Sequence, residues 1–383
     1  MKNEYMNKML PGTASRGKYK SECHPERREG SFKKKIRILY LLAVLTLCLM
    51  SGCGEKKSAV TEENDNMHIT VGFSQLGAES DWREANTRSI RSTLSRENGF
   101  ELLFDDAQQK QDKQIIAIRK FIQQEVDYIV LAPVTETGWD AVLGEAKDAG
   151  IPVVIVDRRV DVKDEELFTA WIGSDFAKEG VVACEWLYEY TKAKGISASE
   201  LRIADIQGTL GATAQIGRTE GIKKGAAKYG WKIVAAEPAD YTRAKGREVM
   251  ERLLRTNPEI NVAYCENDNE AIGVIEAIEA AGLKAGADIK NGEILVISFD
   301  AARSGLNMVL EGKIALDVEC NPIQGASVRG VINSVNEGRE YEKYTYVTEM
   351  AFSADDTVQS VKIGDEDYRI TTLTEKLLEM REY

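Results

Sequence analysis

From about residue 68 onward, short apolar segments alternate with amphipathic ones along the chain. The clearest apolar segment is 151–157, IPVVIVD, a run rich in β-branched residues with no polar alternation. Such a run is typical of a strand buried on both faces of a parallel sheet. Before it, Ile115, Ile118 and Ile122 stand at helical spacing. Strand–helix alternation with short links predicts parallel, doubly wound sheets with right-handed crossovers.

The strand–helix pattern occurs in two successive halves of similar size. We expect the main strands at 68–75, 100–107, 127–134, 151–157, 201–208, 231–239, 260–268 and 292–300, with a further strand at 313–319. At 383 residues the chain is long for one core and fits two domains plus appendages. The predicted fold class is therefore α/β, built from two similar units in series.

Several predicted strands end in polar residues. These are Ser74–Gln75, Asp105–Asp106, Asp157–Arg158, Asn267–Asp268 and Asp300. In open α/β sheets, ligands bind outside the carboxyl ends of the strands. The Asp157–Arg158 pair alone is equally well explained as an exposed, salt-bridged turn. The occurrence of polar residues at several other predicted strand ends favours a binding site instead.

The residue types at these ends suit a neutral polyhydroxy ligand. Carboxylates, amides and an arginine supply the donors and acceptors that sugar hydroxyls need, and Phe73 and Trp82 can pack against a sugar ring. Paired carboxylates could also serve a glycosidase. The adjacent arginine and asparagine favour binding over hydrolysis, so we do not expect an enzyme.

Other chemistries lack their motifs in this sequence. The only histidines are His24 and His68, which argues against a histidine-based triad or metal cluster. Neither G-x-G-x-x-G after the first strand nor a P-loop motif occurs. The segment 207–215, QGTLGATAQ, could hold an anion or simply let the backbone approach a ligand closely. We expect no cofactor and no metal.

The segment 33–52 has the pattern of an export signal. Three lysines precede the apolar run from Ile38 to Met50, which is too short to span a bilayer but long enough for a signal core. The following Ser51-Gly52-Cys53 resembles a bacterial lipoprotein signal, which predicts lipidation of Cys53. An ordinary cleaved signal or an uncleaved anchor are the alternatives.

The flanking segments carry no fold pattern. Residues 1–32 are either the product of a start codon assigned too far upstream or a disordered extension, and 53–67 is expected to be a tether. Without residues 1–52, the chain has 39 Lys and Arg against 58 Asp and Glu, a net charge of −19. Such a body repels nucleic acid. Apart from Cys53, the cysteines after residue 52 are Cys184, Cys265 and Cys320, and we expect each to pack as a small apolar residue.

Six motifs, in order along the chain, resemble one protein family. They are 72–89, 104–122, 132–158, 206–214, 241–251 and 266–283. They are similar to the solute-binding proteins of sugar ABC transporters, in the ribose-binding-like group, and within it to the galactofuranose-binding proteins. The resemblance covers about 68–383. It implies the type 1 periplasmic binding protein fold, in which two Rossmann-like lobes joined by a three-segment hinge close around a sugar.

The resemblance also implies lobe boundaries and site residues. The N-terminal lobe would be 68–173 with 322–350, and the C-terminal lobe 174–321 with 351–383. The implied ligand-binding residues are Ser74, Gln75, Glu79, Trp82, Arg83, Asp106, Asp157 and Arg158 from the first lobe, and Thr213, Arg243, Asn267, Asp300 and Glu319 from the second. Asp105, Ala107 and Glu266 depart from the residues usual in the family, which bears on the identity of the sugar.

Together these features predict a monomeric, lipid-anchored extracytoplasmic binding protein. It would capture a monosaccharide, preferably a furanose such as galactofuranose, and deliver it to the transmembrane subunits of an ABC permease. The alternative function is sensing, in which the sugar-bound form docks on a chemoreceptor or a sensor kinase. No nucleic acid partner is expected.

Overall fold

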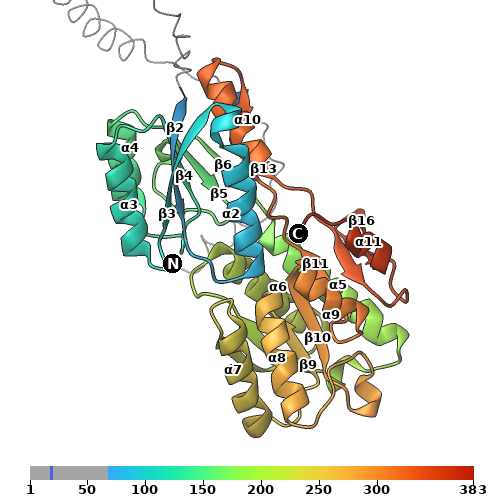
Figure 1. Cartoon of the computed structure of the whole chain (residues 1–383). Helices are drawn as coiled ribbons and strands as arrows, with labels where there is room; N and C mark the ends of the chain where they lie inside the picture. The colour runs from blue at the N-terminus through green and yellow to red at the C-terminus, as the bar shows by residue number, and fades with distance from the viewer. Residues whose placement is uncertain (1–17, 20–67) are drawn as a thin grey trace, which may run out of the picture. The chain divides into compact units, whose positions relative to one another are not determined.

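The computed structural model describes residues 18–19 and 68–383, in two units. In the smaller unit, β1 (Lys18–Tyr19) pairs antiparallel with β12 (Tyr341–Glu342). The larger unit comprises 68–331 and 343–383 and holds both predicted lobes except 332–342, which belongs to the smaller unit (Figure 1). The predicted signal 33–52, the lipidated Cys53, the tether and nearly all of the extension 1–32 lie outside the described residues.

The first lobe is built on a six-stranded parallel sheet in the order β13-β6-β5-β4-β2-β3. Its strands are β2 (Ile69–Gln75), β3 (Phe100–Asp106), β4 (Tyr128–Leu131), β5 (Val153–Val156), β6 (Ala170–Gly173) and β13 (Tyr344–Tyr346). Its helices are α2 (Asp81–Thr93), α3 (Gln111–Gln123), α4 (Asp140–Asp148) and α10 (Gly325–Asn336), with short 3₁₀ turns η3 (Arg96–Asn98) and η4 (Glu165–Leu167). Figure 1 shows α3 and α4 on one side of the sheet and α2 on the other, which is the doubly wound arrangement.

The second lobe contains a seven-stranded sheet in the order β17-β14-β11-β10-β9-β7-β8. Its strands are β7 (Arg202–Gln207), β8 (Lys232–Pro238), β9 (Val262–Cys265), β10 (Leu295–Asp300), β11 (Leu316–Glu319), β14 (Ala351–Ser353) and β17 (Thr371–Thr372), and a separate hairpin joins β15 (Ser360–Ile363) to β16 (Glu366–Arg369). Its helices are α5 (Phe176–Ala193), α6 (Thr213–Tyr229), α7 (Arg243–Thr256), α8 (Asp268–Ala280), α9 (Arg303–Leu310) and α11 (Glu375–Glu379), with 3₁₀ turns η5 (Ala198–Glu200) and η6 (Ile289–Asn291).

Three connections join the lobes, at 174–175, 320–324 and 347–350. The two-lobe α/β fold with a three-segment hinge is therefore confirmed. Two strands depart from the all-parallel prediction, because β14 runs antiparallel to β11 and the edge strand β17 runs parallel to β14. The third connection delivers the chain to the edge at which β11 ends, so β14 has to run in the opposite direction.

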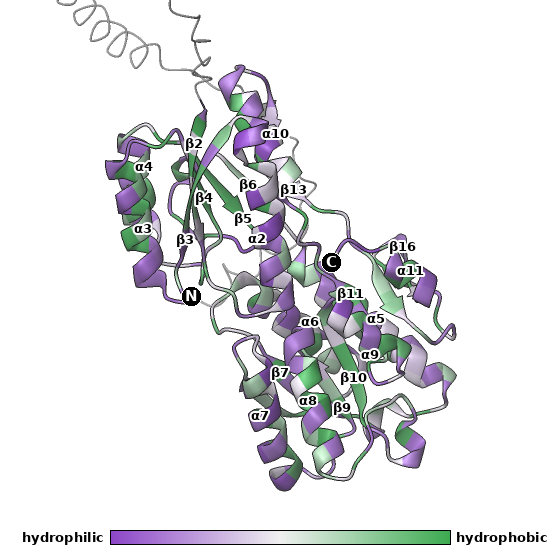
Figure 2. Ribbon diagram, in the orientation of Figure 1, coloured by the Kyte–Doolittle hydropathy of each residue, from purple (hydrophilic) through white to green (hydrophobic). Residues whose placement is uncertain are grey.

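The central strands are buried because helices cover both faces of each sheet. Every residue of β4 and β5 is buried, as is every residue of β9 and β10. Figure 2 shows these strands as hydrophobic and the outer helix faces as largely hydrophilic. This burial explains the uninterrupted apolar runs in the sequence. No helix in the described residues is both long and apolar enough to span a membrane.

Helices α5 and α6 touch through two glycines, Gly180 and Gly221. A Cβ on Gly221 would lie 2.6 Å from the Cα of Gly180, so the two backbones leave no room for a side chain. By contrast, a Cβ on Gly144 in α4 would meet no atom within 4 Å. The structure therefore leaves no room for a side chain at Gly221 but has room for one at Gly144.

We expect Gly221→Ala to destabilise the protein by about 1–3 kcal/mol, because the helices must separate to fit the methyl group. Gly144→Ala should instead stabilise it by about 0.5–1 kcal/mol, since alanine is the better helix former. Urea unfolding of the two variants measures both effects. Equal changes in the free energy of unfolding would contradict the close contact of α5 and α6.

A buried acidic pair lies in the second lobe at β7 and β9. Asp205 Oδ2 accepts a hydrogen bond from Gln207 Nε2 at 2.9 Å, and its Oδ1 has no partner among the described residues. Glu266 accepts from Thr219 Oγ1 at 2.5 Å and from the Gly208 backbone N–H at 2.8 Å. Burial raises the pKa of Asp205 to about 7, and burial together with the Asp205 charge raises the pKa of Glu266.

The raised pKa of Asp205 makes stability depend on pH. An unfolded aspartate loses its proton near pH 4, whereas folded Asp205 keeps its proton to about pH 7, so stability falls as pH rises between these values. Asp205→Asn cannot ionise and should flatten this fall by up to about 1.4 kcal/mol per pH unit. Urea unfolding at several pH values from about 4 to 8 measures the slope. Parallel curves for parent and variant would show that Asp205 does not titrate in this range.

Candidate ligand-binding site

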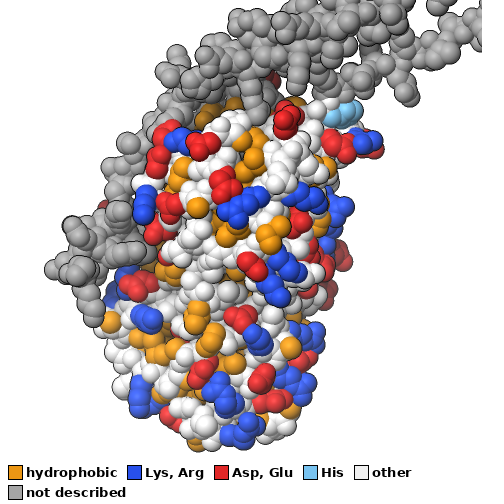
Figure 3. Space-filling model, turned by 90° about the vertical axis from the view of Figure 1, so that its left-hand side faces the viewer, with side chains coloured by type: hydrophobic (Ala, Val, Ile, Leu, Met, Phe, Trp, Pro, Cys, Tyr) orange, Lys and Arg blue, Asp and Glu red, His pale blue; other side chains and the backbone are white. Residues whose placement is uncertain are grey.

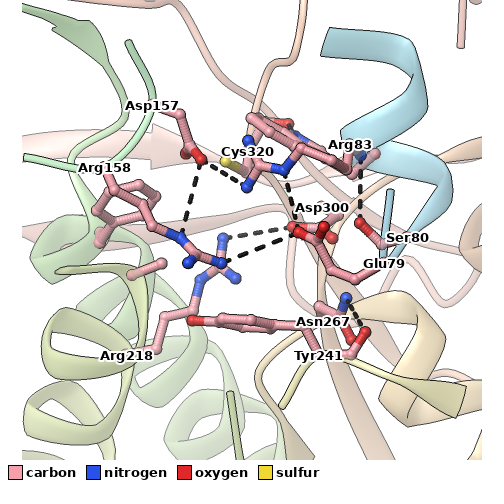
Figure 4. Close-up of a pocket in the computed structure, with 13 residues that line it drawn as sticks. Glu79, Ser80, Arg83, Asp157, Arg158, Arg218, Tyr241, Asn267, Asp300 and Cys320 are labelled. Atoms are coloured by element: carbon pink, nitrogen blue, oxygen red, sulfur yellow. Dashed lines mark hydrogen bonds and ion pairs between the residues drawn. The ribbon is translucent and has the colours of Figure 1, made fainter. Parts of the chain in front are cut away.

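A cavity lies between the carboxyl ends of the two sheets, with about 280 Å³ of empty space that includes open solvent. It is lined by Glu79, Ser80, Trp82, Arg83, Asp157, Arg158, Phe176, Ala214, Arg218, Tyr241, Asn267, Asp300 and Cys320. Figure 4 shows these side chains converging from both lobes. The location agrees with the rule that ligands bind at the strand ends of α/β sheets.

On the first-lobe side, Arg83 is the centre of a buried ion-pair network. Ser80 caps α2 by accepting a hydrogen bond from the Arg83 backbone N–H at 3.2 Å, which fixes the first turn. The Arg83 guanidinium then reaches Asp157 Oδ2 at 2.7 Å and Glu79 Oε1 at 3.0 Å. Asp157 follows β5 with a positive φ of 62°. These ion pairs therefore fix the start of α2 against the end of β5.

Arg158 lies where the two lobes meet. Its Nη1 donates to the Val134 backbone oxygen at 2.7 Å, and its guanidinium carbon lies 5.1 Å from the centre of the Tyr241 ring. Val134 belongs to the first lobe and Tyr241 to the second. The side chain is thus fixed by a backbone acceptor on its own lobe and packed by an aromatic ring on the other.

On the second-lobe side, Arg218 is the centre of a similar buried ion-pair network. It extends from the middle of α6, and its Nε reaches Glu179 Oε2 at 2.7 Å. Its Nη2 lies 3.5 Å from Asp300 Oδ1, and its Nη1 donates to the backbone oxygen of Glu266. Asp300 ends β10 with a φ of 103°, a left-handed conformation that L-residues seldom adopt. The arginine therefore anchors the strained end of β10.

Asn267 combines a structural role with its place in the cavity wall. Its Oδ1 accepts the Glu270 N–H at 2.8 Å and so caps α8, while its Nδ2 donates to the Tyr241 backbone oxygen at 3.2 Å. The asparagine is 2 % exposed. Its orientation is therefore set by the helix start and by the loop that carries Tyr241.

The charged groups of the cavity balance. Three arginines, Arg83, Arg158 and Arg218, face three carboxylic residues, Glu79, Asp157 and Asp300. Burial lowers the pKa of Arg83, but the Asp157 and Glu79 carboxylates outweigh burial and raise it. Burial raises the pKa of Asp300, and Arg218 opposes this.

Apart from Asp157 Oδ2, which is ion-paired with Arg83, three polar atoms of the lining residues are buried without a hydrogen-bond partner among the described residues. They are Arg83 Nη1, Glu79 Oε2 and the Tyr241 hydroxyl. One is a donor, one is an acceptor and the hydroxyl can act as either. Unpaired buried polar groups are costly, so this arrangement favours a ligand that offers both donors and acceptors.

Of the residues predicted from the sequence, the structure brings seven to the cavity. These are Glu79, Trp82, Arg83, Asp157, Arg158, Asn267 and Asp300. Trp82 Nε1 donates to the Cys320 backbone oxygen at 2.5 Å, so this aromatic residue also links α2 to the second connection.

Six predicted residues do not line the cavity. Asp106 is exposed and accepts the Gln108 N–H at 2.8 Å, and the Arg243 side chain is 57 % exposed and pairs with Glu276. Buried Gln75 turns towards α2, where its Nε2 donates to Asn86 at 3.1 Å and Thr87 at 3.0 Å, and Ser74 is fully buried beside it.

Thr213 and Glu319 have contacts elsewhere. Thr213 Oγ1 accepts the Arg159 backbone N–H at 3.0 Å, and the Glu136 N–H donates to the Gly211 oxygen at 3.0 Å. Both bonds join the lobes outside the cavity. Glu319 accepts the Met350 N–H at 2.8 Å and pairs with Arg381 at 2.7 Å, beside the hinge.

Six lining residues were missed by the sequence reasoning. They are Ser80, Phe176, Ala214, Arg218, Tyr241 and Cys320. Three of them lie inside the motifs that carry the family resemblance, which could have revealed them: Ser80, Ala214 and Tyr241. Arg218 is one of several basic residues on α6, and no local feature of the sequence separates it from exposed Lys223 and Lys224.

Comparisons with known proteins agree with this geometry. Residues 71–326 match the family model described as a periplasmic binding protein domain. The galactofuranose-binding protein YtfQ of Escherichia coli (strain K12) is 38% identical over 282 residues, which cover 72% of this chain and 85% of that protein.

Two solved structures are similarly close. A Mycobacterium smegmatis protein in complex with β-D-fucofuranose has a TM-score of 0.70 at 41% identity, covering 74% of this chain and 91% of that chain. The binding component of the arabinose ABC transporter from Shewanella sp. ANA-3, bound to L-arabinofuranose, has a TM-score of 0.69 at 40% identity. The match covers 75% of this chain and 93% of that chain. The chain therefore belongs to the periplasmic binding protein family, in its ribose-binding-like group.

Proposed function

We propose that this protein binds one neutral monosaccharide in its furanose form and delivers it to an ABC permease. The observation that carries the proposal is the balanced, fully buried set of charged groups in the cavity. Three arginines with three carboxylic partners leave no excess charge to attract a charged ligand. They supply directed donors and acceptors, which are what sugar hydroxyls require.

The unpaired polar atoms support a polyhydroxy ligand in particular. Arg83 Nη1, Glu79 Oε2 and the Tyr241 hydroxyl come from both lobes and have no partner among the described residues. A sugar hydroxyl both donates and accepts, so one ring can serve all three atoms. Trp82 and Phe176 supply apolar surface for the ring faces.

The preference for a furanose is supported by the relatives. Proteins 36–41% identical to this chain include structures that hold β-D-fucofuranose and L-arabinofuranose and one that is a galactofuranose-binding protein.

Delivery to a permease and anchoring by lipid are part of the proposal. The segment 33–52 followed by Cys53 supports export and lipidation, which would hold the protein at the outer face of the membrane that contains the permease. Figure 3 shows basic and acidic side chains interspersed on one face of the folded body, an arrangement unlike a nucleic-acid-binding surface. The lobe boundaries expected from the sequence remain part of the proposal and are supported by the strand order of the two sheets.

A screen of neutral sugars tests the ligand class. We expect an aldose that forms a stable furanose, such as galactofuranose, fucofuranose or arabinofuranose, to stabilise the full chain by about 2.7 kcal/mol at 100 times its dissociation constant. Thermal unfolding measures this as a shift of a few degrees. Pyranose-locked methyl glycosides of the same sugars serve as controls. A larger shift with the locked pyranosides would contradict the furanose preference, and no shift with any sugar would contradict sugar binding.

Substitutions in the cavity test the site. Asp157→Ala and Asn267→Ala should each weaken sugar binding by about 2 kcal/mol, or about 30-fold, because buried partners lose their hydrogen bonds. Asp106→Ala and Arg243→Ala remove predicted residues that lie outside the cavity and should bind like the parent. Calorimetric titration of the four variants gives the affinities, and their unfolding curves check folding. Weakened binding by the second pair alone would show that the cavity is not the sugar site.

A further inference from the structure

The three connections between the lobes each bring one polar side chain to a buried cluster beside the cavity. Ser174 comes from the first connection, Cys320 from the second and Glu349 from the third. Glu179, in the first turn of α5, completes the cluster. Ligand atoms of Glu179, Cys320 and Glu349 lie within 4.8 Å of one another, and Ser174 Oγ lies 3.2 Å from Cys320 Sγ.

One oxygen of this cluster has no partner. The Glu179 side chain is 2 % exposed, and its Oε2 pairs with Arg218 at 2.7 Å. Its Oε1 is buried and makes no hydrogen bond within the described residues. A buried carboxylate oxygen without a donor is costly. It therefore points to a positively charged or proton-donating group that the described residues, in their ionised forms, do not supply.

The charges of the cluster show what would satisfy it. In their deprotonated forms, the two carboxylates and the thiolate would carry three negative charges, and Arg218, which also pairs with Asp300, would offset one of them at most. One divalent cation would offset two more. The alternative is protonation, because burial raises the pKa of the Cys320 thiol, raises the pKa of Glu179 to about 7 and raises that of Glu349 to about 9. A proton satisfies one oxygen, whereas a metal ion can take a ligand atom from all three residues.

We propose that Glu179, Cys320 and Glu349 bind a divalent metal ion of the zinc type at the hinge. A thiolate among the ligands favours Zn²⁺ over Mg²⁺ or Ca²⁺, which prefer oxygen ligands only. Three protein ligands leave a position for water or for the Ser174 hydroxyl. On binding, the Cys320 thiol and any protonated carboxyl release their protons to solvent, since metal ligands must be deprotonated.

The proposed metal site has a consequence for the lobes. Its ligands come from the second and third connections and from the helix that follows the first, so a bound ion would cross-link the hinge. Glu179 also holds Arg218, which holds Asp300 in the cavity wall. The metal ion would thereby restrict hinge motion and fix one wall of the sugar site.

Cobalt substitution tests the site directly. The full chain, freed of metal by a chelator, is titrated with Co²⁺ and then with Zn²⁺ under reducing conditions. We expect a near-ultraviolet thiolate-to-cobalt charge-transfer band that saturates at one ion per chain and is displaced by Zn²⁺. Cys320→Ser should abolish the band, whereas Cys265→Ser, a buried cysteine of β9 outside the cluster, should retain it.

Glu349→Gln supplies a second variant, in case loss of Cys320 disturbs the hinge. It keeps the thiol and should weaken Zn²⁺ binding by at least about tenfold. Unfolding curves of the metal-free variants check folding. The proposal is overturned if the parent shows no cobalt band, or if the band persists in Cys320→Ser, because the cluster would then hold a proton. Sugar binding is measured separately, so failure here leaves the proposed function untouched.

Discussion

The site depends on one constraint, which is that a guanidinium group buried in protein must be paired. Arg83 and Arg218 are almost fully buried, and each is paired with carboxylates from other elements. Breaking such a pair would strand a charge in the interior at a cost of several kcal/mol. The helix starts, strand ends and connections that carry the partners are therefore fixed relative to one another. This preorganisation lets a cavity between two lobes present fixed donors and acceptors to a flexible sugar.

The fold could be predicted from the sequence almost completely, because buried parallel strands leave an unmistakable apolar pattern. The polar strand ends also gave the location of the site, and Asp157, Asn267 and Asp300 are found there. The direction of each side chain could not be predicted in the same way. Gln75 ends a strand as Asp157 does, yet it turns towards α2 and fills its hydrogen bonds inside the first lobe.

Residues on helices were the hardest to find. Arg218 lines the cavity as Arg83 does, but it lies in the interior of α6 among other basic residues. Its role comes from the close contact of α5 and α6 at Gly180 and Gly221, which is a tertiary feature. The cluster of Glu179, Cys320 and Glu349 at the hinge could not be predicted from the sequence for a related reason. Its members are far apart in the sequence and meet only because three connections cross at one place.

Two hydrogen bonds join the lobes outside the cavity, so holding the lobes together and recognising the sugar depend partly on different residues. The Glu136–Gly211 hydrogen bond uses backbone atoms alone, and the Arg159–Thr213 bond uses a backbone N–H and a hydroxyl. Neither involves a residue that lines the cavity. The energy of holding the lobes together is therefore partly independent of the cargo. Mutations in the cavity can change which sugar is recognised while the closing contacts stay intact, so new specificities can evolve on an unchanged closing mechanism.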